Sequence, residues 1–408
     1  MYDVYKIREQ FPMFKQTMQG KPLVFLDNAS TTFKPQCVID AMNRYYSECT
    51  SNSHRGDYDL ANVVDLEIED TRKNVAKFVN CDEKEVVFTG GDTLSINHVA
   101  YGWGLKFLKP GDQILLTEAE HASNVLPWYH VAKLTKAEVK FIPLTNEGEI
   151  TIENFKKVIN DKVKIVCVAH IGNVLGYENP VKEMIKIAHE YHSLVLIDGA
   201  QSVPHIKTDF KGFNMDFLTF SAHKMCGPTG LGVLIGKYDL LDKMDCFLTG
   251  GGMNVTFDNE TNVEPYLPPK KFEAGTMPIG EIFGFNAAIK FINEIGIENI
   301  YAHEIELHEY LKEQLKDCDK VIVYNPNCLG SIFSFNVKGV FPQDGGTLFN
   351  YHGIAVRSGL HCAKMLPNVL NYVATVRMST YLYTTKEEID AFVDVIKNGG
   401  DILDAYFN

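Results

Sequence analysis

Short apolar runs alternate with helix-like segments between about residues 60 and 240. Apolar side chains recur with the period of a helix in the intervening segments, for example on the face shared by Val64, Ile68, Val75 and Phe78. The apolar runs do not alternate with polar residues, which is typical of strands buried on both faces. The pattern therefore predicts an α/β domain with a mostly parallel, seven-stranded sheet flanked by helices. The seven expected strands are Glu85–Thr89, Asp112–Thr117, Val139–Pro143, Val163–His170, Leu194–Asp198, Phe217–Ser221 and Gly232–Ile235.

The pattern changes after about residue 250, where glycine-rich and proline-rich stretches predict long loops. A long helical stretch from about Glu281 to Lys316 follows, then strand-like segments at Val321–Tyr324 and Ser331–Val337. A capping box at Thr385 and Glu388 predicts the start of a final helix. We expect a large domain over residues 16–284 and a smaller α+β domain over residues 285–408, with residues 1–15 packed on the smaller one.

One segment of the predicted helical stretch looks like a zinc motif. His303 and His308 flank two glutamates, but the histidines are five residues apart. Five steps of about 100° place them on different faces of a helix, so they cannot share a metal ion. We expect a solvated helix here and no metal site.

Composition narrows the class of protein. The chain has 408 residues, of which 45% are hydrophobic and 22% charged, as in ordinary folded proteins. Its formal net charge of −13 disfavours binding to nucleic acid or to anionic lipid. The apolar runs are far shorter than the roughly 20 residues that cross a bilayer, so no membrane association is expected. The N-terminus lacks the layout of a secretory signal, and the nine cysteines form no C-x-x-C pair, so we expect a cytoplasmic protein.

Charged residues follow two of the predicted buried strands. Asp198 ends one strand, and Lys224 comes shortly after the next. A carboxylate at such a position costs several kcal/mol to desolvate unless it meets a cation or a strong donor. A structural ion pair or a turn cap would explain either residue alone. Together with Gln201 and Ser221 at their spacings, however, the two residues favour a functional site.

This set resembles the signature of pyridoxal phosphate (PLP) enzymes of fold type I, within the class V aminotransferase group. The resemblance implies that Asp198 pairs with the pyridine nitrogen, Gln201 neighbours the ring oxygen, and Lys224 condenses with the aldehyde of the cofactor. Ser221 and His223 would bind the phosphate. An ionised aspartate keeps the ring nitrogen protonated, and the protonated ring accepts electrons from the substrate.

Two further matches lie at predicted strand ends. His121, after the strand ending at Thr117, is similar to the histidine that stacks on the cofactor ring in this group. Read alone, a histidine there is more often a satisfied polar residue. Asn173, in His170-Ile-Gly-Asn173, resembles the asparagine that approaches both the ring and the substrate carboxylate. The resemblance implies that His121 also manages protons on the substrate.

The segment from Arg357 to Ala363 resembles the R-x-G-x-H-C-A motif of SufS-type, group II cysteine desulfurases. The resemblance implies that Cys362 is the nucleophile that accepts sulfur, although most cysteines in a chain only pack. Neighbouring cations lower the pKa of a thiol and favour the reactive thiolate. Arg377 matches the arginine that clamps the substrate carboxylate, with Arg357, Asn28 and Ala29 also expected at the substrate.

The phosphate-binding segment departs from this family. Thr89-Gly-Gly-Asp92-Thr93-Leu94 precedes a predicted helix, whose first amides would bind the phosphate together with the Thr93 hydroxyl. Asp92, also expected among the cofactor-binding residues, stands where the family usually has a hydroxyl residue, and its charge would oppose that of the phosphate. Leu94 stands where an acidic residue is usual.

The resemblance as a whole implies a homodimeric cysteine desulfurase. Such an enzyme converts L-cysteine to L-alanine, holds the sulfur as a persulfide on Cys362, and passes it to an acceptor protein for iron–sulfur cluster assembly. Thr276, His54 and Arg55 would contribute to the partner chain's cofactor site. Two alternatives stay open: a selenocysteine lyase or another class V lyase, and a catalytically silent scaffold, which the altered residue at Asp92 motivates.

Overall fold

The computed structural model describes residues 2–53 and 56–399. All seven predicted strands form one sheet in the order β4-β10-β9-β8-β7-β5-β6. Strand β10 runs antiparallel to both of its neighbours, whereas the pairs from β9 to β6 are parallel, which confirms the mostly parallel sheet. The strands are β4 (Val86–Thr89), β5 (Gln113–Leu116), β6 (Glu138–Phe141), β7 (Val163–Ala169), β8 (Leu194–Asp198), β9 (Phe217–Ser221) and β10 (Gly232–Gly236).

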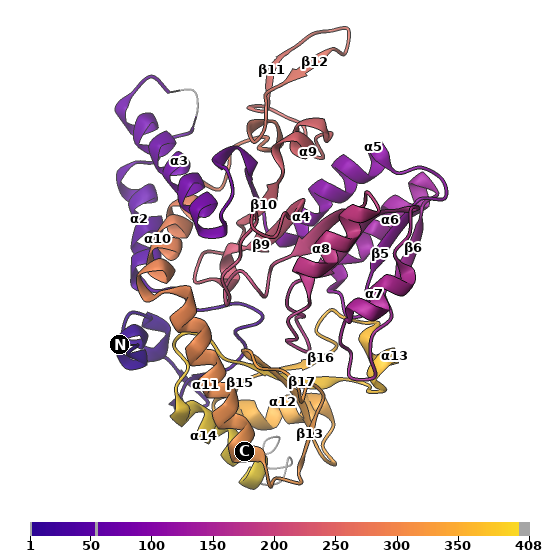
Figure 1. The fold of residues 1–408 in the computed structure, drawn as a ribbon. Coiled ribbons are helices and arrows are strands. Elements are labelled where there is room, and N and C mark those ends of the chain that lie inside the picture. The colour runs from indigo at the N-terminus through magenta and orange to yellow at the C-terminus, as the bar shows by residue number, and fades with distance from the viewer. Residues whose placement is uncertain (1, 54–55, 400–408) are drawn as a thin grey trace.

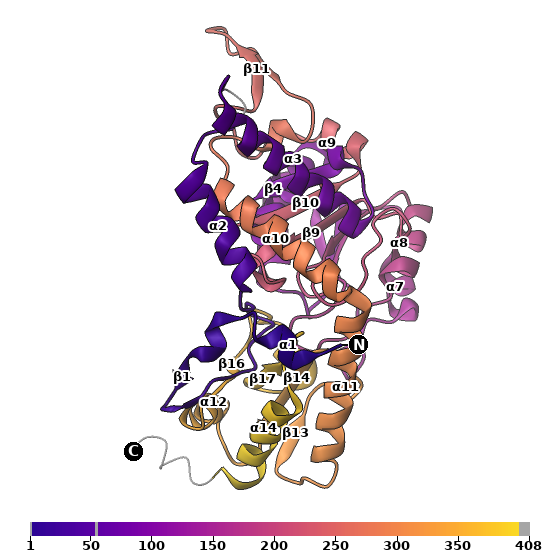
Figure 2. The ribbon, with the colours of Figure 1, turned by 90° about the vertical axis from the view of Figure 1, so that its left-hand side faces the viewer.

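Helices cover both faces of this sheet, as Figures 1 and 2 show. Successive strand residues enter different cores: Val86 and Phe88 belong to one hydrophobic cluster and Val87 to the other. On the first face pack α3 (Asp59–Val79), α8 (Val181–Glu190) and α10 (Ile279–Ile295), with α2 (Gln36–Glu48) against α10. On the second face pack α4 (Asp92–Val99) and α6 (Leu126–Thr135). Burial on both faces explains why the strands are continuously apolar.

A glycine lets the first turn of α4 lie directly against the sheet. A Cβ atom at Gly232 would come within 2.4 Å of the Gly91 Cα atom, a distance that real side chains do not tolerate. The main-chain N–H of Asp92 donates to the Ser221 hydroxyl at 2.8 Å. The N-terminus of α4 is thereby fixed beside the end of β9.

The smaller C-terminal part has its own core (Figure 1). A four-stranded sheet in the order β13-β14-β17-β16 packs with α11 (Ile297–Leu315), α12 (Pro342–Tyr351) and α14 (Lys386–Asn398). Its strands are β13 (Val321–Val323), β14 (Ile332–Val337), β16 (Arg357–Gly359) and β17 (Thr375–Ser379). The expected capping box is present at Thr385 and Glu388. At the other end of the chain, Arg8 of α1 (Val4–Arg8) pairs with Glu388 at 2.7 Å.

The predicted helix from Glu281 to Lys316 is two helices. Gly296, with φ of 89°, separates α10 from α11 and turns the chain from one core to the next. Ile289 and Ile292 of α10 pack in the large core, whereas Leu307 and Leu311 of α11 pack in the small one. The apolar periodicity continues across the glycine, so it could not reveal the break.

The expectation of a solvated helix around His303 is wrong. Glu304 is fully buried and contacts the His205 ring nitrogen Nδ1 at 2.7 Å, and His308 is also buried. Burial lowers the pKa of His308 to about 4, so its ring is neutral. The helix has partners on several sides because it lies between the two cores, which its local sequence could not show.

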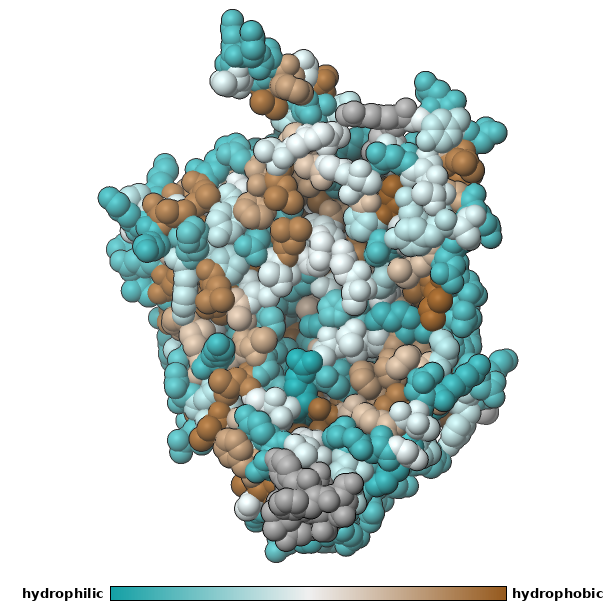
Figure 3. All heavy atoms as spheres, turned by 180° about the vertical axis from the view of Figure 1, so that it is seen from behind, coloured by the Kyte–Doolittle hydropathy of each residue, from teal (hydrophilic) through white to brown (hydrophobic). Residues whose placement is uncertain are grey.

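A β-hairpin projects from the large part of the molecule (Figures 1 and 2). Its strands are β11 (Asn254–Phe257) and β12 (Val263–Pro265). More than half of the surface is exposed on four of its apolar residues, Val255, Phe257, Val263 and Leu267. Figure 3 shows brown and tan residues at the base of this projection.

In the part of the chain that the structure describes, no helix combines the length and hydropathy needed to span a membrane.

Candidate active site

A cavity of about 230 Å³ lies at the carboxyl ends of the parallel strands, where α/β sheets bind their ligands. Loops after β7, β8 and β9 form its inner wall, and residues of the smaller sheet close it from the other side. The predicted residues that line it are Ala29, Asp92, Thr93, His121, Asn173, Asp198, Gln201, Ser221, His223, Lys224, Arg357, Cys362 and Arg377. The structure thus brings together side chains from segments more than 300 residues apart.

Asp198 and Lys224 lie on neighbouring strand ends of this cavity. Asp198 is buried, and its Oδ1 accepts the Ala200 main-chain N–H at 2.9 Å. Burial lowers the pKa of the Lys224 amine, whereas the charge of Asp198 is the largest influence that raises it. A desolvated amine with a lowered pKa is a stronger nucleophile and base at neutral pH than an exposed one.

His121 is held by hydroxyl groups at the rim of the cavity. Its Nδ1 accepts the Ser123 N–H at 3.1 Å, and the Ser123 hydroxyl in turn lies 2.7 Å from the Thr93 hydroxyl. Burial is the main reason why the pKa of His121 is lowered. Because Nδ1 accepts a hydrogen bond, the neutral ring carries its proton on Nε2. That nitrogen can then exchange a proton with a ligand in the cavity.

Glu120 fixes the segment that carries His121. Its carboxyl accepts the Thr117 hydroxyl at 2.8 Å, the Asn124 amide at 2.8 Å and the Ala169 N–H at 3.0 Å. These bonds tie the end of β5 to the end of β7. Burial raises the pKa of Glu120 to about 8.

Two arginines converge at the opposite side of the cavity. Arg377 Nη1 donates to the Asn173 carbonyl at 2.6 Å, and its Nη2 lies 3.4 Å from Asp27. Arg357 Nε lies 3.3 Å from the other oxygen of the same Asp27. Arg377 is almost fully buried, and burial lowers its pKa to about 10, so it stays charged at neutral pH. The pair leaves one positive charge uncompensated, which suits one carboxylate ligand.

Cys362 follows strand β16 on a turn in an unusual backbone conformation. His361 and Cys362 have φ of 49° and 60°, in the left-handed region that costs free energy for residues other than glycine. Hydrogen bonds to two main-chain carbonyls hold the turn: the Asn173 side-chain amide donates to the His361 carbonyl at 2.7 Å, and the Ala122 main-chain N–H donates to the Cys362 carbonyl at 2.8 Å. Cys362 is exposed. It therefore stands at the opening of the cavity, held by both parts of the molecule.

Four residues that the resemblance assigned to the active site are not among the described residues that line this cavity. Asn28 does not line the cavity: its amide donates to the Ser379 carbonyl at 2.7 Å and its carbonyl accepts the Tyr383 hydroxyl, so it holds the turn that carries Ala29 instead. Thr276 is exposed in a separate hollow beside Asn52 and Ser53. His54 and Arg55 lie outside the described residues.

The cavity fits the expected cofactor. Three buried polar atoms in it have no hydrogen-bond partner: Asp92 Oδ1, Gln201 Oε1 and Arg377 Nε. Buried polar atoms without partners are rare and costly, so this cavity is built for a polar ligand. Asp198 supplies a carboxylate for a ring nitrogen, Lys224 an amine for an aldehyde, and the start of α4 with Thr93 and Ser221 supplies amides and hydroxyls for a phosphate.

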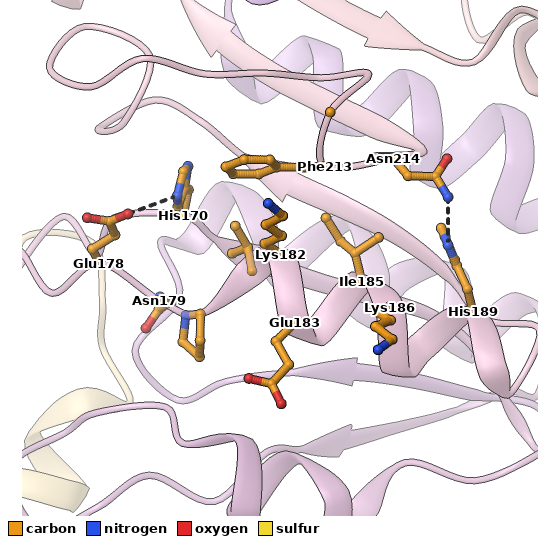
Figure 4. Close-up of a pocket in the computed structure, with 13 residues that line it drawn as sticks. His170, Glu178, Asn179, Lys182, Glu183, Ile185, Lys186, His189, Phe213 and Asn214 are labelled. Atoms are coloured by element: carbon orange, nitrogen blue, oxygen red, sulfur yellow. Dashed lines mark hydrogen bonds and ion pairs between the residues drawn. The ribbon is translucent and has the colours of Figure 1, made fainter. Parts of the chain in front are cut away.

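A larger groove of about 810 Å³ runs along α8 (Figure 4). Its rim is formed by charged and exposed side chains such as Lys182, Glu183 and Lys186, and Phe213 lies across it. His170 at one end contacts Glu178 at 3.7 Å. None of the predicted catalytic residues lines this groove, so its size does not make it the active site.

Three residues around the cavity escaped the sequence analysis. Asp27 bridges the two arginines, Ser123 supports His121, and Lys34 donates to the His223 carbonyl at 3.2 Å. Asp27 directly precedes Asn28, and Ser123 lies two residues after His121. The partners of Asp27 and Lys34 lie 350 and 189 residues away in sequence, so nothing local marked their roles, whereas Ser123 contacts His121 two residues before it.

Comparisons with known proteins agree with this geometry. The family model "Aminotransferase class-V" matches residues 24–392. A cysteine desulfurase of Haloferax volcanii is 41% identical over 97% of this chain and 96% of its own length. A probable cysteine desulfurase of Halalkalibacterium halodurans is 43% identical, over 95% of this chain and 96% of its own length. The crystal structure of the cysteine desulfurase CsdA of Escherichia coli superposes with a TM-score of 0.91 at 32% identity, covering 98% of both chains.

Proposed function

The chain belongs to the class V aminotransferase family, and we propose that it is a PLP-dependent cysteine desulfurase of the SufS type. The observation that carries this proposal is the cavity in which Lys224, Asp198 and Arg377 meet Cys362. Its substrate is L-cysteine and its products are L-alanine and an enzyme-bound sulfur atom. The direct test is to supply L-cysteine to the purified holoenzyme and to measure alanine and, with a reducing thiol, sulfide. Alanine without sulfide or persulfide would contradict it.

Each residue of the cavity has a distinct task. When bound, PLP supplies an aldehyde that takes up the substrate amine and a ring that withdraws electrons from the α-carbon. Arg377 holds the substrate carboxylate with its planar guanidinium group. The Lys224 amine removes the α-proton, and His121 Nε2 holds or returns a proton near the substrate thiol. Asp198, at the inner end of the cavity, keeps a ring nitrogen protonated.

Cys362 completes the reaction. Its thiolate sulfur attacks the sulfur atom of the substrate, so that an S–S bond forms and the Cβ–S bond breaks. The electron pair of the broken bond stays with carbon, which takes up a proton and becomes the methyl group of alanine. The exposure of Cys362 supports a further step, in which an acceptor protein collects this sulfur for iron–sulfur cluster assembly. We place the reaction in the cytoplasm.

The exposed hairpin and Thr276 support a homodimer. Large apolar side chains on a projecting hairpin are rarely left in water, so we infer that a second copy of the chain covers them. Thr276 lines a separate hollow and not the cavity of its own chain, and in a dimer it would reach the cavity of the partner. Replacing Phe257, which is 72% exposed, by Asp should weaken the dimer at least about tenfold because it buries a charge at the interface. Sedimentation equilibrium measures this, and an unchanged dissociation constant would exclude the hairpin from the interface.

Replacing Arg377 by Lys should raise the KM for cysteine while the absorption spectrum of the cofactor changes little. Lysine keeps the positive charge but loses the two-pronged geometry, and it cannot span both the Asn173 carbonyl and the substrate. Loss of a bidentate pair is worth about 1.5–3 kcal/mol, so KM should rise roughly 10- to 100-fold. Steady-state kinetics with cysteine decide the point. A KM close to that of the wild type would refute the clamp.

A further inference from the structure

Asp92 is the first residue of α4 and lies at the inner wall of the cofactor cavity. Its side chain is 9% exposed, and its Oδ1 has no hydrogen-bond partner. The main-chain N–H donates to the Ser221 hydroxyl, which anchors the start of the helix. The carboxyl faces the Thr219 hydroxyl on β9. An acid in this position therefore reaches neither bulk water nor a strong donor.

The charges around Asp92 do not neutralise it. Asp198, paired in register with Thr219, is a second carboxyl in electrostatic range and opposes ionisation. Lys224 favours ionisation but is shared with Asp198. The other titratable groups lining this cavity are His121, His223, His361, Arg357, Cys362 and Arg377. No ion pair joins Asp92 to any cation within residues 2–53 and 56–399.

We propose that Asp92 is a neutral carboxylic acid in the working enzyme, and that its ionisation in alkali loosens the phosphate end of the cofactor. The proposal rests on the proposed function, because it requires that the cavity hold PLP. As a neutral acid Asp92 can replace the hydroxyl residue usual in the family, since both donate a hydrogen bond and neither repels a dianion. The presence of Asp92 in place of the usual hydroxyl residue is then compatible with cofactor binding and activity at neutral pH.

The expected pH range follows from the burial of the carboxyl. Burial and the Asp198 charge raise the pKa of Asp92 to about 8, against 3.8 for an exposed aspartate. The group is therefore protonated below about pH 8 and becomes charged as the pH rises through that value. A bound phosphate dianion opposes ionisation further, so in the holoenzyme the transition falls at or above pH 8. Cofactor binding should be unaffected at pH 6.5 and weakened above the transition.

The test measures the rate of PLP release from the holoenzyme between pH 6.5 and 9.5, by ultrafiltration and absorbance of the filtrate. Asp92→Asn keeps the shape and a donor but cannot ionise. The ratio of wild-type to Asp92→Asn release rates should be near one at pH 6.5 and about ten at pH 9.5, since a new charge would lie close to a dianion. Taking a ratio cancels the titration of groups that both proteins share, such as Lys224.

Glu304→Gln is the matched control, because Glu304 is another buried carboxyl whose pKa is raised by burial and it does not line this cavity. This variant should keep the wild-type dependence of release on pH. If Asp92→Asn does not fold, Asp92→Thr is measured in the same way and should also give a ratio that rises with pH.

Two results would overturn the proposal. A ratio near one at every pH means that ionisation of Asp92 does not affect the cofactor. A ratio near ten already at pH 6.5 means that Asp92 is charged throughout. A protein that binds no PLP at all contradicts the proposed function itself, so the two failures are distinguishable.

Discussion

Replacing Lys224 by alanine should abolish the covalent attachment of PLP and reduce cysteine turnover by roughly 10²- to 10⁴-fold, the range in which a general base contributes to catalysis. The fold should be retained, because no hydrogen bond or ion pair described in the structure involves the Lys224 amine. Borohydride reduction followed by mass spectrometry of peptides locates the lysine that carries the cofactor. In the variant, no peptide should carry it.

Lys34 offers the matched control for this experiment. Its amine is also buried, and burial lowers its pKa to about 8, so it is the nearby lysine most able to react in place of Lys224. It donates to the His223 carbonyl at 3.2 Å but does not line the cavity. Lys34→Met should therefore still carry reducible PLP on Lys224. Finding the cofactor on Lys34 in the wild type, or on any lysine in Lys224→Ala, would refute the assignment.

Replacing Cys362 by alanine should leave PLP binding intact and remove the persulfide. Within residues 2–53 and 56–399 the side chain makes no hydrogen bond, and hydrogen bonds to main-chain carbonyls hold the turn, so alanine fits the same backbone. Sulfur release from cysteine should fall at least about 10³-fold, since loss of a nucleophile is among the largest effects of single substitutions in enzymes. The absorption change on adding cysteine should persist because it precedes sulfur transfer.

Cys37 provides a control for locating the persulfide. Among the cysteines within the described residues, only Cys37 and Cys362 are exposed. Mass spectrometry after treatment with cysteine should find the additional sulfur atom on Cys362 in both the wild type and Cys37→Ala. Undiminished persulfide in Cys362→Ala would show that another thiol is the acceptor.

The parts that the sequence could predict are those in which a short segment determines its own environment. Asp198, Ser221 and Lys224 stand at the ends of strands whose apolar runs are unambiguous, so both the sheet and the inner wall of the cavity followed from the pattern. The charged residue at the end of a buried strand was the most informative signal, because it is costly without a partner.

The parts that the sequence could not predict depend on distant partners. Asn28 was expected at the substrate, but its amide donates to the carbonyl of Ser379, 351 residues away, and it does not line the cavity. The local sequence around Glu304 is typical of a solvated helix. Its buried contact with His205, 99 residues earlier in the chain, is visible only in the structure. Asp92 is the clearest case: its sequence position indicated repulsion of a phosphate, whereas its surroundings decide whether it carries a charge at all.

The exposed turn at Cys362 also constrains the order of events. Lys224 and Arg377 lie deeper in the same cavity, and Cys362 stands at its opening. We therefore expect incoming cysteine and the proposed sulfur acceptor to approach the same opening. The two half-reactions have to alternate, so the kinetics should be of the ping-pong type, and a large excess of cysteine should compete with the acceptor and slow the delivery of sulfur.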